Sequence, residues 1–136
     1  MKYICVNVDN GDTILQDSTY HLSKNFTVDE MACKDGSDTL LYSHRLMMLI
    51  QAIRAIVGPI TINSAFRPPA YNKRVGGVVG SYHQYGVAVD MAIPKGYTPD
   101  SFYKVIEQVC GTQCSIGVYN SFVHLDIGHV ARWDKR

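Results

Sequence analysis

Residues 81–90 read SYHQYGVAVD, and this stretch decides how the rest of the chain is interpreted. It holds two candidate metal ligands, His83 and Asp90. Gly86 lies between them, where a chain that leaves a loop often needs a backbone conformation that only glycine adopts at low cost. Small Ala88 precedes the acid on the same face of the short apolar strand that we expect here. A hydrolytic zinc ion normally takes three protein ligands and leaves the fourth position for water, so the stretch predicts part of a zinc site.

The third ligand that we predict is His124, one of five histidines in the chain. Residues 122–127 read FVHLDI. A period of two puts His124 and Asp126 on one face of a strand, and Val123 and Leu125 on the other. A polar pair that points away from an apolar face is typical of a site built on a strand.

The stretch at 81–90 resembles the Ser-x-His-x-x-Gly-x-Ala-x-Asp signature of the zinc D-Ala-D-Ala carboxypeptidase family of metallopeptidases, first subfamily, found in bacteria and their phages. Further segments resemble the family in the same order along the chain: SAFRPPAYN at 64–72, VGG at 75–77, FVHLD at 122–126 and RW at 132–133. Together the resemblance covers residues 23–134. Several separated motifs are more specific than one pattern alone.

This resemblance implies an α+β fold with a small antiparallel sheet and helices packed on one side. The family shares this fold with lysostaphin-type peptidases and the hedgehog signalling domain. The zinc would lie on the open face of the sheet, held by His83, Asp90 and His124. The family's arginine corresponds to Arg67, which would face the zinc and steady the oxyanion of the tetrahedral intermediate. Ser81 would hydrogen-bond the substrate's carboxylate or a ligand, unless it is a simple turn serine. Tyrosines 82, 85 and 119 would line the cleft or pack in the core.

The sequence departs from the family at the general base. In many relatives an acidic residue three places before the third ligand takes the proton from water, and here that position is Ser121. Our substitute candidate is Asp126; its alternative role is to orient a ligand histidine. His129 is a weaker candidate. Position 122 is Phe, where many relatives in the wider superfamily carry histidine.

Composition fits an ordinary globular chain of 136 residues with a formal charge of +1. We expect one domain over residues 1–136, with an added N-terminal hairpin over 1–20. No run of Lys and Arg indicates nucleic-acid binding, and no apolar run is long enough for a membrane span. We expect a monomer. The N-terminus does not have the pattern of a signal peptide, so action on a cell wall would follow lysis, delivery on a phage particle or non-classical export.

Helices are predicted at 43–57 and from Thr98 to Gly111, and a capping box opens a short helix at 27–30. The first of these has an apolar stripe: Leu46, Leu49, Ile50, Ile53, Ile56 and Val57. We expect reduced, buried cysteines. Residues Cys110 and Cys114 also have a spacing that fits a disulfide or a metal pair.

These sequence features and the family resemblance predict two alternative functions. The first is a zinc metallopeptidase that hydrolyses peptidoglycan stem peptides at a D-amino-acid bond. It would act as a D-Ala-D-Ala carboxypeptidase or as a cross-link endopeptidase. Its origin would be a phage or prophage lysin or a bacterial wall-remodelling enzyme. The alternative is a non-catalytic module that keeps the zinc for stability and binds the cell wall or a protein. The missing acid at Ser121 keeps this alternative open.

Overall fold

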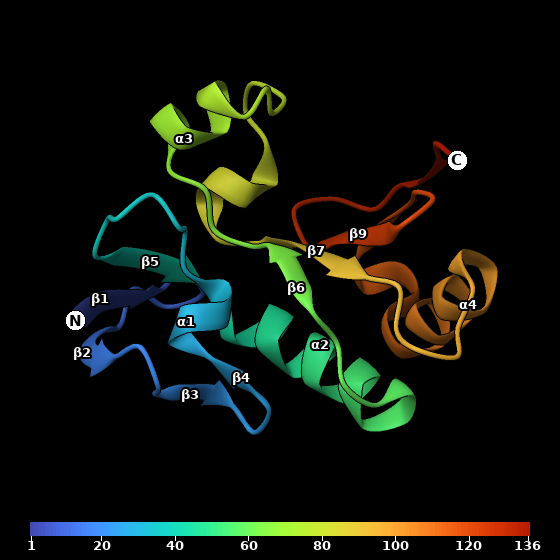
Figure 1. Ribbon diagram of the computed structural model, residues 1–136, viewed down its shortest axis with the longest axis horizontal. Helices are drawn as coiled ribbons and strands as arrows, with labels where there is room; N and C mark the ends of the chain where they lie inside the picture. Colours follow the sequence, from blue (N-terminus) through green and yellow to red (C-terminus); the bar gives the residue numbers. More distant parts are fainter.

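A computed structural model describes residues 1–136, and its centre is a five-stranded sheet with the order β10-β8-β9-β7-β6 (Figure 1). All neighbouring pairs are antiparallel except β10, which runs parallel to β8. The strands are β6 (Ile62–Ser64), β7 (Ala88–Ala92), β8 (Ser115–Val118), β9 (Phe122–Asp126) and β10 (Arg132–Asp134). Strands β8 and β9 form a hairpin around residues 120–121.

Two helices, α2 (His44–Val57) and α4 (Pro99–Cys110), pack against each other, and α4 packs on β8 and β9. Side chains from both helices share one core with the inward-facing residues of the sheet. Val89 and Leu125 are fully buried there, as strand alternation predicts. The expected α+β fold, with a small sheet and helices on one side, is confirmed. None of the helices has the length and apolar character needed to span a membrane.

A second, three-stranded sheet lies at the N-terminal end of the molecule, with the order β2-β1-β5 (Figure 1). Strands β1 (Lys2–Asn7) and β2 (Thr13–Asp17) form the antiparallel hairpin expected from the sequence, and β5 (Thr39–Tyr42) joins β1 in parallel. A short pair, β3 (His21–Ser23) and β4 (Phe26–Thr27), leads into α1 (Val28–Met31), which has the predicted capping box. The hairpin contributes Tyr3 and Cys5 to the common core.

The chain between β6 and β7 is mostly irregular and carries α3 (Pro69–Arg74) and the 3-10 turn η1 (Tyr82–Tyr85). Gly86 ends this turn with φ of +75°. A Cβ at Gly86 would lie 2.5 Å from the backbone of Leu41 on β5. Glycine therefore lets the turn that carries His83 sit directly against the N-terminal sheet.

Two expectations need correction. On α2 the buried face includes Met47, whereas Ile56 is exposed, because the core reaches the start of the helix more fully than its end. Residues Cys110 and Cys114 form a disulfide instead of remaining reduced, with Cα atoms 6.0 Å apart. The 3-10 turn η2 (Gly111–Gln113) after α4 folds the chain back and brings the two cysteines together. The other two cysteines are free and buried, as expected.

The contact at Gly86 predicts a specific loss of stability. Gly86→Ala places a Cβ in a left-handed backbone conformation and against the Leu41 backbone. The matched control is Gly96→Ala, where φ is +85° but nothing lies within 4 Å of the added atom. Backbone strain alone costs about 1–2 kcal/mol, so we expect that loss for the control and a larger one for Gly86→Ala in urea denaturation. Equal losses would show that the contact with Leu41 contributes nothing.

Candidate metal centre

One cross-strand row of the five-stranded sheet carries the centre of the site. The register pairs Asp90 on β7 with His124 on β9, His124 with Gly117 on β8, and Gly117 with Trp133 on β10. Because directly opposite residues on neighbouring strands point to the same face, the carboxylate and the imidazole meet away from the helices. The Nδ1 atom of His124 lies 2.9 Å from Oδ1 of Asp90.

The imidazole of His83 reaches the same carboxylate from the turn η1. Oγ of Ser81 caps this turn by accepting the backbone N–H of His83 at 3.3 Å. His83 is 2% exposed, and its Nδ1 lies 2.7 Å from the carbonyl oxygen of Ala65. A carbonyl only accepts, so Nδ1 carries the proton and donates it. The Nε2 atom, 3.2 Å from Oδ1 of Asp90, therefore presents its lone pair to the centre when the ring is neutral.

A buried carboxylate orients His124 in the same way. Its Nε2 lies 2.8 Å from Oδ2 of Asp126, which is 1% exposed. Since the carboxylate accepts, Nε2 donates and Nδ1 is the atom left to face Asp90. Metal-binding histidines in proteins almost always donate their other ring N–H to a carboxylate or a backbone carbonyl. Both arrangements occur here.

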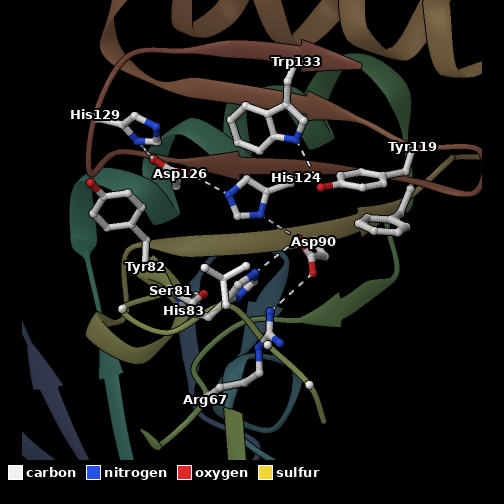
Figure 2. A pocket seen from close by; sticks show the side chains of 15 residues that line it. Arg67, Ser81, Tyr82, His83, Asp90, Tyr119, His124, Asp126, His129 and Trp133 are labelled. Carbon is white, nitrogen blue, oxygen red and sulfur yellow. Dashed lines mark hydrogen bonds and ion pairs between the residues drawn. The ribbon is translucent and has the colours of Figure 1, made fainter. Parts of the chain in front are cut away.

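The three predicted ligands, His83, Asp90 and His124, are thus brought together. One ligand atom from each lies within 4.8 Å of the other two. Two imidazole nitrogens and one carboxylate oxygen are the donor set of a catalytic zinc site, which leaves a fourth position for water. The cluster opens into a cavity of about 380 Å³ (Figure 2), so water and a substrate can reach it. The residues present fit a zinc ion.

The electrostatics of the metal-free cluster favour a cation. Burial raises the pKa of Asp90, but hydrogen bonds and charge from His124 and His83 outweigh burial and hold that pKa well below its usual range. Burial lowers the pKa of His124, yet hydrogen bonds to Asp126 and Asp90 raise it to about 9. A zinc ion at these ligands would compete with the proton on His124.

Arg67 lies in the cavity beside the cluster, as the sequence predicts. Its Nη2 is 3.8 Å from Oδ2 of Asp90, the oxygen that does not face the two histidines. The Arg67 backbone N–H donates to the carbonyl of His83 at 3.0 Å, which ties the extended residue before Pro68 to the turn η1. Its Nε is buried without a hydrogen-bond partner. The guanidinium therefore has donor capacity left for a ligand in the cavity.

The other two predicted site residues are Ser81, whose position suits substrate binding, and Asp126, whose contacts do not suit a general base. Ser81 lines the cavity, and because its Oγ accepts from His83, its O–H remains free to donate. Both oxygens of Asp126 are already used: Oδ2 accepts from His124, and Oδ1 accepts from the Gly128 backbone and His129. The His124 ring separates Asp126 from Asp90. These contacts favour the orienting role over that of a general base.

An aromatic wall was only partly foreseen. Tyr82 and Tyr119 line the cavity as expected, whereas Tyr85 points to solvent. The indole of Trp133 lies over Gly117, where a Cβ would come within 2.2 Å of the ring, and its centroid is 5.4 Å from that of His124. Its N–H donates to the Tyr119 hydroxyl at 3.1 Å. The signal in the sequence was a glycine in the middle of a strand, which often marks a close approach.

The fold and the cluster define a class: an α+β protein with an accessible His–Asp–His centre on one face of a small sheet. A family model described as Peptidase M15 matches residues 23–126. The chain belongs to the Peptidase M15 family, and its resemblance to the zinc D-Ala-D-Ala carboxypeptidases is thereby confirmed. The matched segment contains the three predicted ligands, Arg67, Ser81 and Asp126, and ends before His129 and Trp133. No curated protein matches the chain.

The raised pKa of His124 predicts how metal binding depends on pH. At neutral pH the imidazole of the metal-free site is protonated, because its pKa is about 9. Zinc binding must release that proton, so affinity should rise by about tenfold for each pH unit until the pKa is reached and then level off. Titration against a competing chelator over a pH series measures this, and calorimetry in two buffers counts the released protons. An affinity independent of pH on the acidic side would contradict the assignment of His124.

Proposed function

We propose that this protein is a zinc-dependent peptidase that hydrolyses peptidoglycan stem peptides at a bond to a D-amino acid. Membership in the Peptidase M15 family supports a peptidase. The observation that carries the proposal is the convergence of the three ligand atoms within 4.8 Å, with both histidine tautomers set by hydrogen bonds outside the cluster. A purely structural polar cluster has no need of this orientation.

In this proposal His83, Asp90 and His124 hold the metal. When bound, zinc supplies Lewis acidity and lowers the pKa of water. Arg67 places a permanent positive charge beside the cluster, where its guanidinium stabilises the negative oxygen that forms on the substrate carbonyl. Ser81 donates its free O–H to the substrate's carboxylate. Asp126 keeps Nε2 of His124 protonated, so that Nδ1 faces the metal.

Two cleavage modes agree with the cavity, a D-Ala-D-Ala carboxypeptidase and a cross-link endopeptidase. The cavity is open to solvent, and both the glycine-rich segment 76–80 and the aromatic wall line it. Such a groove accommodates either a free peptide end or a chain that continues past the cleaved bond. A phage or prophage lysin would use the second mode to break the wall.

A non-catalytic module with a structural zinc is the second candidate. The observation that favours it is Ser121, which occupies the position of the family's acid, is exposed and does not line the cavity. Such a module would bind the cell wall or a protein partner without cleaving it.

The decisive experiment is product analysis by mass spectrometry. Purified muropeptides, both with free D-Ala-D-Ala ends and cross-linked, are incubated with zinc-loaded or chelator-treated protein. We expect zinc-dependent loss of D-Ala or splitting of dimers. His83→Ala should abolish both zinc binding and hydrolysis, while His44→Ala, at an exposed position on α2, should change neither. Wall binding without any cleavage by zinc-loaded protein would favour the binding module.

Substitution of Arg67 separates electrostatic stabilisation from metal binding. Arg67→Ala should lower kcat by about 10²–10³-fold, as loss of an oxyanion donor typically does. Zinc stoichiometry should remain one per chain, because Arg67 is not a ligand. The matched control is Arg45→Ala on the exposed side of α2. A wild-type kcat for Arg67→Ala, measured with the muropeptide cleaved by the parent protein, would exclude this role.

A further inference from the structure

We propose that Tyr119 is a substrate-binding residue whose hydroxyl donates a hydrogen bond to a main-chain carbonyl oxygen of the stem peptide. This inference deepens the proposed peptidase function and rests on it, because the ligand is the proposed substrate. Tyr119 follows β8 and begins the tight turn that leads into β9. Its backbone N–H donates to the carbonyl of Phe122 at 3.0 Å, so the turn fixes the backbone from which the ring projects.

Two contacts hold the phenol ring and its oxygen in place. The ring stacks on Phe122 with centroids 4.4 Å apart and planes inclined by only 7°. The indole N–H of Trp133 donates to the hydroxyl oxygen at 3.1 Å, and Trp133 is itself packed over Gly117. The phenol is therefore oriented before a ligand arrives. A donor that is already ordered loses less conformational entropy on binding than a mobile one.

The hydrogen-bond pattern leaves the hydroxyl proton of Tyr119 free. An indole N–H can only donate, so the hydroxyl oxygen is the acceptor in its contact with Trp133. The oxygen still carries its own proton, and no acceptor in the protein takes that proton. Because Tyr119 lines the cavity, the proton is available to a ligand there.

The hydroxyl lies on the part of the aromatic wall that faces the metal ligands. The ring centroids of Trp133 and His124 are 5.4 Å apart, and the hydroxyl is hydrogen-bonded to the same indole. It is therefore within about three residues of extended peptide from the imidazole, at about 3.3 Å per residue. Figure 2 shows the Tyr119 hydroxyl pointing towards Trp133 and His124, whereas the Tyr82 hydroxyl points away from them. A peptide that extends from the cluster along this wall comes within reach of Tyr119.

The chemistry of this part of the cavity fits a peptide chain. Each residue of a peptide carries a carbonyl oxygen that accepts hydrogen bonds. In the proposed function Arg67 stabilises the oxygen that becomes negative, and Ser81 binds the carboxylate. Tyr119 is then the donor for a neutral carbonyl further along the chain. A site built to bond such an oxygen also rejects ligands that lack it, because its donor would be left unpaired.

The test asks whether the hydroxyl serves the substrate or only the Trp133 indole. Tyr119→Phe keeps the stacked ring and removes the hydroxyl. We expect it to raise the KM for a stem pentapeptide by about 3- to 10-fold, the loss typical of one hydrogen bond, with kcat and zinc content unchanged. Calorimetry with chelator-treated protein should show the Kd of the same pentapeptide rising by the same factor. Tyr20→Phe, at an exposed position, is the control and should change neither constant.

A second background separates the two roles of the hydroxyl. In Trp133→Phe the indole N–H is gone, so the Tyr119 hydroxyl has lost its hydrogen bond within the protein. If the hydroxyl served only that contact, adding Tyr119→Phe to this background would change nothing, and such a result would overturn the proposal. If the hydroxyl binds the substrate, KM and Kd should rise again in the double variant.

The same measurements distinguish a failure of this proposal from a failure of the proposed function. A parent protein that cleaves the pentapeptide, with KM and Kd unchanged in Tyr119→Phe, would overturn the role of Tyr119 alone. A parent protein that binds the pentapeptide without cleaving it would overturn the peptidase, and the Kd comparison would then decide the role of Tyr119. A parent protein that neither binds nor cleaves it would overturn both.

Discussion

The pairing of β7 with β9 in one register is the constraint on which the site depends. It sets Asp90 directly opposite His124 and, on the other face, Val89 opposite Leu125 in the core. A slip by one residue would turn every side chain of a strand to the opposite face and bury the imidazole among helices. The apolar core therefore enforces the geometry of the metal ligands: the free energy that holds Val89 and Leu125 in place also holds the site.

A second constraint is the buried carboxylate of Asp126. A charge that is 1% exposed is costly unless it is hydrogen-bonded, and here three donors reach it: two imidazoles and the Gly128 backbone N–H. One anion thus sets the tautomers of His124 and His129 together. This explains why Asp126 is poorly suited to be a base itself. Its lone pairs are occupied, and protonating it would release both rings from their orientation.

The sequence was sufficient for the fold class, through the resemblance of its separated motifs to a known family. It was also sufficient for the three candidate ligands, because strand alternation and the motif that holds His83 and Asp90 are local patterns. Features that depend on contacts between segments far apart in the sequence could not be predicted. Nothing local shows that β10 lies beside β8, so the contact of Trp133 with His124 over Gly117 could not be foreseen. The disulfide could not be predicted, because it forms only where the chain folds back after α4. The buried face of α2 could not be predicted fully, because it depends on the residues that pack against the helix. Roles set by hydrogen bonds, such as that of Asp126, follow only from atomic contacts.

Position 121 and the ligand position 124 are held differently, and the reason is visible in β9. Its ligand His124 is held by pairing on both sides, whereas Ser121 and His129 lie beyond the two ends of the strand and are exposed. Loop positions tolerate substitution better than paired ones. Serine at position 121 therefore removes the family's acid without moving the ligands. Zinc binding alone consequently does not distinguish a peptidase from a module that binds without cleaving.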